Sequence, residues 1–216
     1  MSSLTILVLG GTGPAGICLL RETLHRKHKV VAFARSPQKV PEDLASNPLL
    51  EIVKGDLSDK EALSRAMSKV NIVLSLLGPQ ISDRTTSPNV IPDFFKNSVF
   101  PAMRRHGVKR IFAMGTLSLS QPEDSWTLIK PAIVLLVRTI AANAYRTIIQ
   151  TGQVFEDDAK DIDWTIYRVA QIPGDSDKES WARDREDGKT FLVNAAEDGL
   201  QDWVRKMPAV LKLANS

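Results

Sequence analysis

The sequence is poor in cysteine, in long apolar runs and in excess charge of either sign. Its 216 residues include one cysteine, Cys18, which excludes a disulfide framework and favours a reducing compartment. The net charge is only +3 and no stretch concentrates it, so we expect no nucleic-acid partner. A single cysteine and three histidines without paired spacing do not predict a metal site.

No segment has the character of a signal peptide or a membrane span. The apolar run 4–9 is short, lacks a basic segment before it and is followed at once by glycines. The more apolar stretch 128–142 contains Lys130, Pro131 and Arg138, and it falls short of the roughly 20 apolar residues that a membrane helix needs. We therefore predict a cytoplasmic protein. The run 128–137 is either a buried or interface helix or an apolar wall over a substrate.

Short apolar runs alternate with amphipathic segments along most of the chain. Continuous aliphatic runs predict strands at 5–9, 30–34, 50–53, 71–77, 109–114 and 164–169. Their regular alternation with helices indicates an α/β fold: a single Rossmann-type domain over 1–216, with a doubly wound parallel sheet and helices on both faces. The C-terminal third is less regular and would contribute the substrate side. There we expect a late strand at 190–193 and a terminal helix at 200–213.

Local signals predict where three of the helices begin. Proline followed by two acidic residues favours a helix start at 41–44. The residues 58–61 form a Ser-x-x-Glu capping box, which predicts that Ser58 caps the next helix. A further helix is expected at 90–106, where Pro92 and Pro101 would shorten or kink it.

A glycine-rich turn, 10–16, lies directly between the first strand and the first helix. Gly10 permits a tight turn, Gly13 lets backbone N–H groups approach a pyrophosphate, and Gly16 lets the helix pack closely. An ordinary glycine-rich turn is the alternative, but the position between strand and helix favours a dinucleotide site. The residues expected to contact the cofactor here are Gly10, Thr12, Gly13, Pro14, Ala15 and Gly16.

The end of the second strand indicates which nicotinamide cofactor is bound. An acid at this place would accept hydrogen bonds from the ribose 2′-OH of NAD, but the strand ends Phe33-Ala34-Arg35-Ser36. A guanidinium suits a 2′-phosphate, so Arg35, with Ser36 beside it, favours NADP(H). The alternative is that Arg35 is a solvated surface charge.

Two further strand ends supply candidate cofactor residues. Gly55-Asp56-Leu57 follows the third strand and Leu76-Leu77-Gly78 follows the fourth, at the edge where open α/β sheets bind ligands. Asp56 would accept a hydrogen bond from the adenine amino group while Leu57 contacts the ring. From its type alone, Asp56 is equally well explained as a turn residue.

These motifs together resemble the short-chain dehydrogenase/reductase superfamily, in particular its atypical branch of NmrA-like proteins and flavin/biliverdin reductase-like NAD(P)H-binding proteins. The segment Asp163-Trp164-Thr165-Ile166-Tyr167-Arg168 is similar to a strand motif of that branch. The resemblance covers roughly 4–169. It implies NAD(P)H binding and cofactor contacts after strands four, five and six, here at Leu76, Leu77, Gly78, Thr116 and Arg168.

The resemblance also implies a catalytic pair that this sequence completes only in part. Many relatives carry a Ser or Thr after strand five and Tyr-x-x-x-Lys on the next helix. Thr116 matches the first element and Tyr145 supplies the tyrosine, but Ile149 occupies the lysine position. A phenol with a pKa near 10 is a poor acid at neutral pH without a neighbouring cation. Tyr145 is therefore either a proton donor or a partly buried helix residue.

The sequence leaves three functions open. The first is an NADPH-dependent reductase that transfers hydride to a small apolar or aromatic carbonyl, enone or flavin-like acceptor, with Thr116 bound to the developing oxyanion. The second is an NmrA-like protein that senses NADP(H) without turnover. The third is a non-redox isomerase or cyclase that uses the same cleft. The expected partner is a small-molecule substrate, and we expect a monomer or homodimer.

Overall fold

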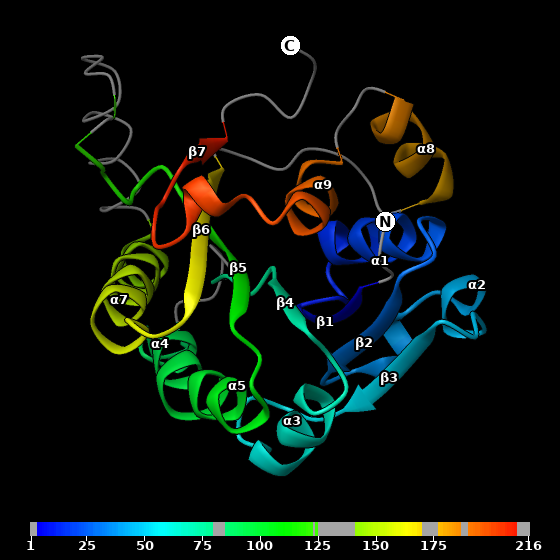
Figure 1. The fold of residues 1–216 in the computed structure, drawn as a ribbon, viewed down its shortest axis with the longest axis horizontal. Helices are drawn as coiled ribbons and strands as arrows, with labels where there is room; N and C mark the ends of the chain where they lie inside the picture. Colours follow the sequence, from blue (N-terminus) through cyan, green and yellow to red (C-terminus); the bar gives the residue numbers. More distant parts are fainter. Residues whose placement is uncertain are drawn as a thin grey trace.

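A parallel sheet of seven strands forms the centre of the computed structural model, which describes residues 4–79, 85–122, 124, 141–169, 177–186 and 190–210 (Figure 1). Every pair of neighbouring strands is parallel. The strands are β1 (Thr5–Leu9), β2 (Lys29–Ala34), β3 (Leu50–Lys54), β4 (Ile72–Ser75), β5 (Arg110–Thr116), β6 (Asp163–Val169) and β7 (Ala209–Val210).

The strand order is β3-β2-β1-β4-β5-β6-β7. The chain starts in the interior of the sheet, moves outward through β2 and β3, and then returns to the other side of β1. The connections that leave β1 and β4 therefore diverge, and this divergence opens a crevice at the carboxyl ends of these two strands. The predicted Rossmann-type α/β fold is confirmed.

Helices cover both faces of the sheet (Figure 1). One face carries α1 (Pro14–His25), α8 (Lys178–Glu186) and α9 (Phe191–Asp198), and the other carries α3 (Lys60–Met67), α5 (Phe100–His106) and α7 (Ala142–Asp158). Successive side chains of a strand point to opposite faces, so Ile6 and Val8 pack in the core beside α1, while Leu7 and Leu9 pack beside α3. The continuous apolar run of β1 reflects this burial on both sides.

The predicted helix 90–106 forms, with wider turns in its middle. It consists of α4 (Val90–Phe94), a π-helical segment η2 (Phe95–Val99) and α5. Pro101 lacks an amide hydrogen and cannot make the usual bond to the residue four positions earlier, which accounts for irregular turns just before it. Buried rings keep the helix together, since Phe155 of α7 lies 4.9 Å from both Phe95 and Phe100, measured between ring centroids.

Two sequence predictions for the C-terminal part were wrong. Residues 190–193 begin helix α9 instead of forming a strand, and the described part of 200–213 holds a short 3-10 helix, η3 (Gln201–Trp203), and strand β7. The apolar residues 191–193 pack against the core beside α1. A run of three apolar residues is too short for its periodicity to distinguish a strand from a helical turn. Leu200, at φ 33°, interrupts any helix that would continue from α9.

The cap of α3 also differs from the prediction. The helix begins one residue later, because Asp59 and not Ser58 accepts a hydrogen bond from the backbone of the first turn, at Ala62 (2.9 Å). The Ser58 hydroxyl bonds instead to the carboxylate of Asp56 (2.6 Å). A short helix, α2 (Glu42–Ala45), forms after Pro41 as expected.

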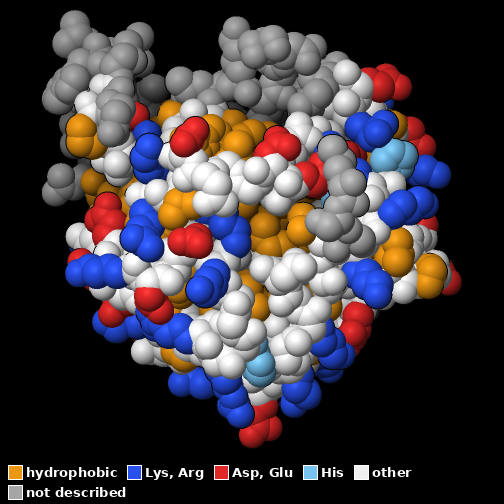
Figure 2. All heavy atoms as spheres, in the orientation of Figure 1, with side chains coloured by type: hydrophobic (Ala, Val, Ile, Leu, Met, Phe, Trp, Pro, Cys, Tyr) orange, Lys and Arg blue, Asp and Glu red, His pale blue; other side chains and the backbone are white. Residues whose placement is uncertain are grey.

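The surface mixes charges of both signs. In the view of Figure 2, Lys and Arg side chains are interspersed with Asp and Glu around the outline, as the small net charge suggests. Within the described ranges, no helix combines the length and apolar character needed to span a bilayer. The same ranges bring together no group of three or more His, Cys, Asp or Glu side chains suited to a metal ion. The run 128–137 lies outside the described residues.

Candidate functional site

A cleft of about 650 Å³ runs along the carboxyl ends of β1 to β4 and is closed on one side by α4 and α7. The loops that follow four parallel strands supply one wall, and two helix starts supply the other. The lining residues shared with the sequence prediction are Gly10, Thr12, Arg35, Gly55, Asp56, Leu57, Leu77 and Gly78. The lining residues that the prediction missed are Leu9, Phe33, Ala34, Ser58, Pro79, Thr86, Ser87, Val90, Ile91, Phe94, Asn143, Ala144 and Thr147.

The glycine turn has the geometry that its sequence predicted. Gly10 has φ +83°, a conformation that side chains disfavour, and a Cβ there would lie 3.0 Å from the carbonyl carbon of Leu76. A Cβ on Gly16 would lie 2.3 Å from the Gly10 carbonyl oxygen, so only glycine allows α1 to start against this turn. A Cβ on Gly13 would meet nothing nearer than that same oxygen, at 3.8 Å. The space above Gly13 is therefore open to a ligand.

The first turn of α1 presents backbone donors that no side chain caps. Its N-cap is Gly13 and its first residue is Pro14, so neither a capping oxygen nor an amide of Pro14 is present. The amide of Ile17 bonds to the Gly13 carbonyl (2.9 Å), while Ala15 and Gly16 precede the first intrahelical partner. Such amides, together with the positive end of the helix dipole, favour a phosphate group.

Arg35 and Asp56 lie near each other at the β2–β3 end of the cleft. Both side chains are exposed and both line it. Hydrogen bonds from the Ser58 hydroxyl and amide hold the pKa of Asp56 below its ordinary value, and the charge of Arg35 lowers it further. Asp56 therefore forms an Asx turn, in agreement with one of the two interpretations of the sequence. Ser36 is half-buried and does not line the described cleft.

The residues after β4 form the floor of the cleft, between the loops after β1 to β3 and the helices α4 and α7. Leu77 and Gly78 line it, whereas Leu76 packs with the apolar core beside α1. Gly13, Pro14, Ala15 and Gly16 do not themselves line the described cleft, although they form the helix start beside it.

Helix α7 turns a different face to the cleft from the one that the sequence suggested. Asn143, Ala144 and Thr147 line the described cleft, whereas Tyr145 is a half-buried residue outside that lining. The Thr147 hydroxyl donates to the Asn143 carbonyl (2.9 Å), so its oxygen is left to accept. Residue type pointed to Tyr145, but a helix places neighbours 100° apart, and only the packing of α7 decides which face meets the cleft.

Thr116 ends β5 with its hydroxyl oxygen accepting a hydrogen bond from the Ser118 amide (3.3 Å). Its side chain is half-buried and is not part of the described cleft lining. Because the hydroxyl accepts in this contact, its own proton is available to a ligand oxygen.

All the hydrogen bonds described for the Arg168 guanidinium go to protein groups in neighbouring loops. Its guanidinium makes two hydrogen bonds to the Asp124 carboxylate, each 2.7 Å, and donates to the carbonyls of Leu119 and Met207. The side chain is 2 % exposed, so a cofactor would have to compete with a buried bidentate ion pair. We therefore leave Arg168 out of the proposed cofactor site and assign it a structural role between β6, the loop after β5 and the residues before β7.

Some of the missed lining residues had a signal in the sequence and others had none. Phe33 and Ala34 are the last residues of β2, directly before Arg35, so a prediction that places Arg35 at the cleft also places them near it. Val90, Ile91 and Phe94 lie at spacings of one helical face, which predicted a helix but not what the face would meet. Asn143 and Thr147 carried no local signal, because their place depends on how α7 packs against α4.

The chain belongs to the NAD(P)H-binding family, whose sequence profile matches residues 10–195. Solved structures share its fold. A wide-type short-chain dehydrogenase/reductase from Veillonella parvula, in complex with NADP, superposes with a TM-score of 0.70 at 14 % identity, covering 98 % of this chain and 95 % of that one. Yeast methylglyoxal/isovaleraldehyde reductase complexed with NADPH gives 0.59 at 15 % identity, covering 86 % and 62 %. The family match thus confirms the NAD(P)H-binding family that the sequence resemblance implied, and the solved structures show a shared fold.

A curated relative matches over a shorter segment. The 3 beta-hydroxysteroid dehydrogenase/Delta 5-->4-isomerase of Mycobacterium tuberculosis is 32 % identical over 68 residues, which are 32 % of this chain. The match spans only 17 % of the length of that enzyme.

Proposed function

We propose that the protein is an NADPH-dependent reductase that binds NADP(H) in preference to NAD(H) along the described cleft. The observation that carries the proposal is Arg35, which lines the cleft at the end of β2, on the far side of the glycine turn from β4. In this fold the group after β2 faces the adenosine ribose, and a guanidinium there suits a 2′-phosphate. The open space over Gly13 and the uncapped amides of α1 suit the pyrophosphate.

The proposed acceptor is a small apolar or aromatic carbonyl, enone or flavin-like molecule. When bound, the cofactor supplies a hydride. Thr116 would donate its hydroxyl proton in a hydrogen bond to the acceptor oxygen, and the Ser118 amide would hold that hydroxyl in place. The whole chain would act as one domain, its C-terminal third forming the substrate side.

A second candidate is a protein that senses NADP(H) and does not turn over. It is favoured by the face that α7 shows to the described cleft: Asn143, Ala144 and Thr147, none of which titrates near neutral pH. Tyr145 lies outside that lining and Ile149 stands where many relatives have lysine. A reductase with this face would take its proton from water or from another part of the chain.

Calorimetric titration with NADPH and NADH tests the cofactor preference through the variant Arg35→Glu. We expect the Kd for NADPH to rise at least about tenfold, equivalent to about 1.4 kcal/mol, because a carboxylate would face the 2′-phosphate. The Kd for NADH should change little. Arg65→Glu, at an exposed position of α3 outside the described cleft lining, makes the same change in net charge and is the matched control.

Turnover separates the two candidates. Purified protein is incubated with NADPH and a panel of quinones, flavins and enones while the absorbance of NADPH is followed. Oxidation that Arg35→Glu slows at NADPH concentrations near the wild-type Kd, and that Arg65→Glu preserves, supports the reductase. Tight NADPH binding without oxidation by any acceptor supports the sensor. Equal affinity of the wild-type protein for the two coenzymes would rule out the role given to Arg35.

A further inference from the structure

The turn after β4 sits between two parts of the molecule that limit its movement. On one side is the glycine turn: a Cβ on Gly10 would lie 3.0 Å from the Leu76 carbonyl carbon and 3.2 Å from the Leu77 nitrogen. On the other side is Met114 of β5, whose terminal methyl would lie 2.8 Å from a Cβ on Gly78. Any shift of this turn therefore alters the floor of the cleft, which Leu77 and Gly78 line.

Besides its pairing with β1 and β5, the last residue of β4 takes part in two side-chain hydrogen bonds, and one of them comes from two strands away. Ser75 is fully buried, and its hydroxyl oxygen accepts from the Leu77 amide (3.3 Å). The phenol of Tyr167 donates to the Ser75 carbonyl (3.3 Å). Tyr167 belongs to β6, so its side chain reaches past β5 to the end of β4.

The Tyr167 hydroxyl lies in apolar surroundings. A phenylalanine ring would pack there equally well, so packing alone does not explain the hydroxyl. The residue is 3 % exposed and belongs to the apolar core beside α1 and α9. A buried hydroxyl costs free energy unless it is hydrogen-bonded, and Ser75 provides the partner. Burial raises the pKa of the phenol above its ordinary value of 10, so the group keeps its proton and remains a donor.

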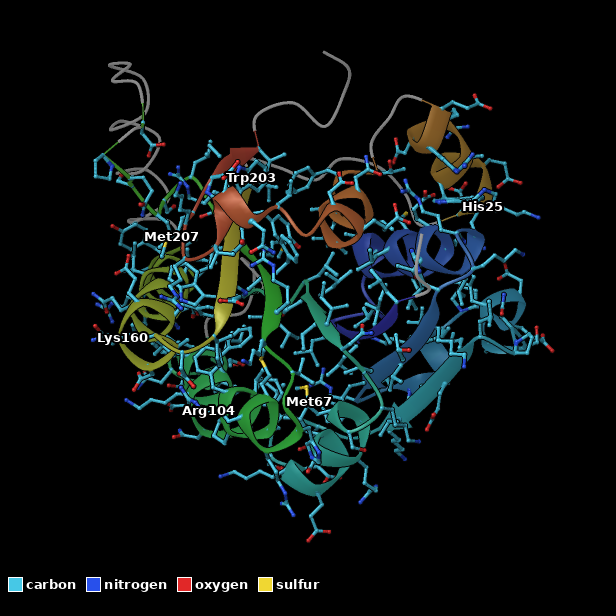
Figure 3. All side chains as sticks on the ribbon, viewed as in Figure 1. His25, Met67, Arg104, Lys160, Trp203 and Met207 are labelled. Carbon is cyan, nitrogen blue, oxygen red and sulfur yellow. The ribbon has the colours of Figure 1, made fainter. Side chains whose placement is uncertain are left out.

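Aromatic rings of the C-terminal elements pack near the Tyr167 ring. The ring of Phe191, at the start of α9, lies 6.2 Å from that of Tyr167, and the ring of Trp203 in η3 lies 5.4 Å from that of Phe191, measured between centroids. Figure 3 labels Trp203 on η3, next to α9. The C-terminal elements therefore contact, through Phe191, the ring whose hydroxyl bonds to β4, and they limit its movement.

We infer that Tyr167 is a positioning residue of the cofactor site, whose hydroxyl fixes the Ser75 carbonyl and thereby the Leu76-Leu77-Gly78 turn against the glycine turn. This inference rests on the proposed function for its link to NADP(H), while its structural part concerns the turn alone. It also gives the C-terminal third a way to influence the cleft, because α9 and η3 pack near the ring that holds the turn.

The test is Tyr167→Phe, which keeps the ring and its aromatic neighbours and removes only the hydroxyl. We expect the Kd and KM for NADPH to rise about three- to tenfold, the range for the loss of one hydrogen bond between neutral groups. The value of kcat at saturating NADPH should stay within about twofold. Hydrogen exchange at the Leu77 amide, measured without cofactor, should become faster.

Thr23→Val is the matched control. Thr23 is a fully buried residue of α1, near the opposite end of the helix from the glycine turn, and its hydroxyl donates to the carbonyls of Leu19 (2.9 Å) and Leu20 (3.0 Å). This variant loses a buried hydroxyl away from the turn and from η3, so it should lower the melting temperature without changing the Kd for NADPH. If Thr23→Val weakens NADPH binding as much as Tyr167→Phe does, the effect is general destabilisation and the positioning role is wrong.

The remaining outcomes also decide the question. Unchanged NADPH affinity in Tyr167→Phe, with unchanged exchange at Leu77, would overturn the inference. If the wild-type protein binds neither coenzyme, the proposed function fails, but the exchange measurement still tests the tie between Tyr167 and the turn. Faster exchange at Leu77 in Tyr167→Phe then supports the tie, and unchanged exchange refutes it.

Discussion

Gly10, Gly13 and Gly16 belong to one sequence motif, but each has a different structural role. Gly10 is needed because its backbone is left-handed and Leu76 lies against it, and Gly16 because the Gly10 carbonyl occupies the place of a Cβ. Gly13 has an ordinary extended backbone, φ −82°, and open space above it. Two of the glycines therefore serve the fold, and the third leaves room for a ligand.

Alanine substitutions separate these roles. Gly16→Ala should lower the free energy of unfolding by about 1–3 kcal/mol, because the new methyl group meets backbone atoms that cannot move aside cheaply. Gly13→Ala should leave the free energy of unfolding within about 0.5 kcal/mol of wild type and raise the Kd for NADPH at least about tenfold. Urea denaturation and calorimetric titration measure the two quantities. If Gly13→Ala binds NADPH with the affinity of the wild-type protein, the pyrophosphate does not lie over Gly13.

Residues whose role follows from their place at a strand end could be predicted from the sequence. Gly10, Thr12, Arg35 and Leu77 line the described cleft because β1, β2 and β4 end there. Arg168 also stands near a strand end, yet its side chain turns to Asp124, a partner 44 residues away that no local pattern reveals. Side-chain direction and long-range pairing are the information that a single sequence withholds.

Among the elements, β1 to β6 were predictable, and the segments after residue 190 were not. The strands β1, β2 and β4 are four- to six-residue segments that are mostly apolar and buried on both faces, which leaves few alternatives. In contrast, α9 and β7 are short and take their form from neighbours. The amides of Ile166 and Arg168 on β6 bond to the carbonyls of Lys206 and Pro208, so the residues just before β7 are held by β6.

A charged network joins α9 to the end of α1. The Glu197 carboxylate accepts hydrogen bonds from His28 (Nε2, 2.8 Å) and Arg26 (2.6 Å), and His28 Nδ1 accepts from the Leu4 amide (3.3 Å). Arg26 also donates to Glu22 (2.7 Å). Burial favours the neutral form of Glu197, but the bonds from His28 and Arg26 outweigh it and hold the pKa below its ordinary value of 4.5.

This network predicts an acid-sensitive attachment of α9. A carboxyl group with a lowered pKa stabilises the fold above its unfolded pKa, and that contribution is lost as the pH falls through the folded pKa. Glu197→Gln should lower the free energy of unfolding at pH 7 by on the order of 1–3 kcal/mol, the range for hydrogen bonds to charged groups. The difference from wild type should shrink as the pH falls below about 4.5.

Urea denaturation at a series of pH values measures this difference. Glu156→Gln, at an exposed position of α7, is the control and should follow wild type at every pH. A difference between Glu197→Gln and wild type that stays constant from pH 7 to below pH 4 would contradict the role of the carboxylate charge.

At the scale of the whole molecule, the sheet brings the carboxyl ends of β1 to β4 to one edge, where they form the cleft. The cleft draws on loops after β1, β2, β3 and β4 and on the starts of α4 and α7, so a cofactor bound in it would bridge segments far apart in the chain. Binding to the native state alone stabilises it according to concentration and affinity, and the unfolded chain would offer no such assembled site.

NADPH should therefore raise the melting temperature of the protein. At a free concentration 100 times the Kd, binding adds about 2.7 kcal/mol, which for a chain of this size corresponds to about 5–10 °C. NADH at the same concentration should give a smaller shift, because it lacks the phosphate that Arg35 would hold. In Arg35→Glu the shift given by NADPH should fall to that given by NADH or below it. Melting curves that neither coenzyme moves, at millimolar concentration, would mean that the assembled cleft does not take a nicotinamide dinucleotide.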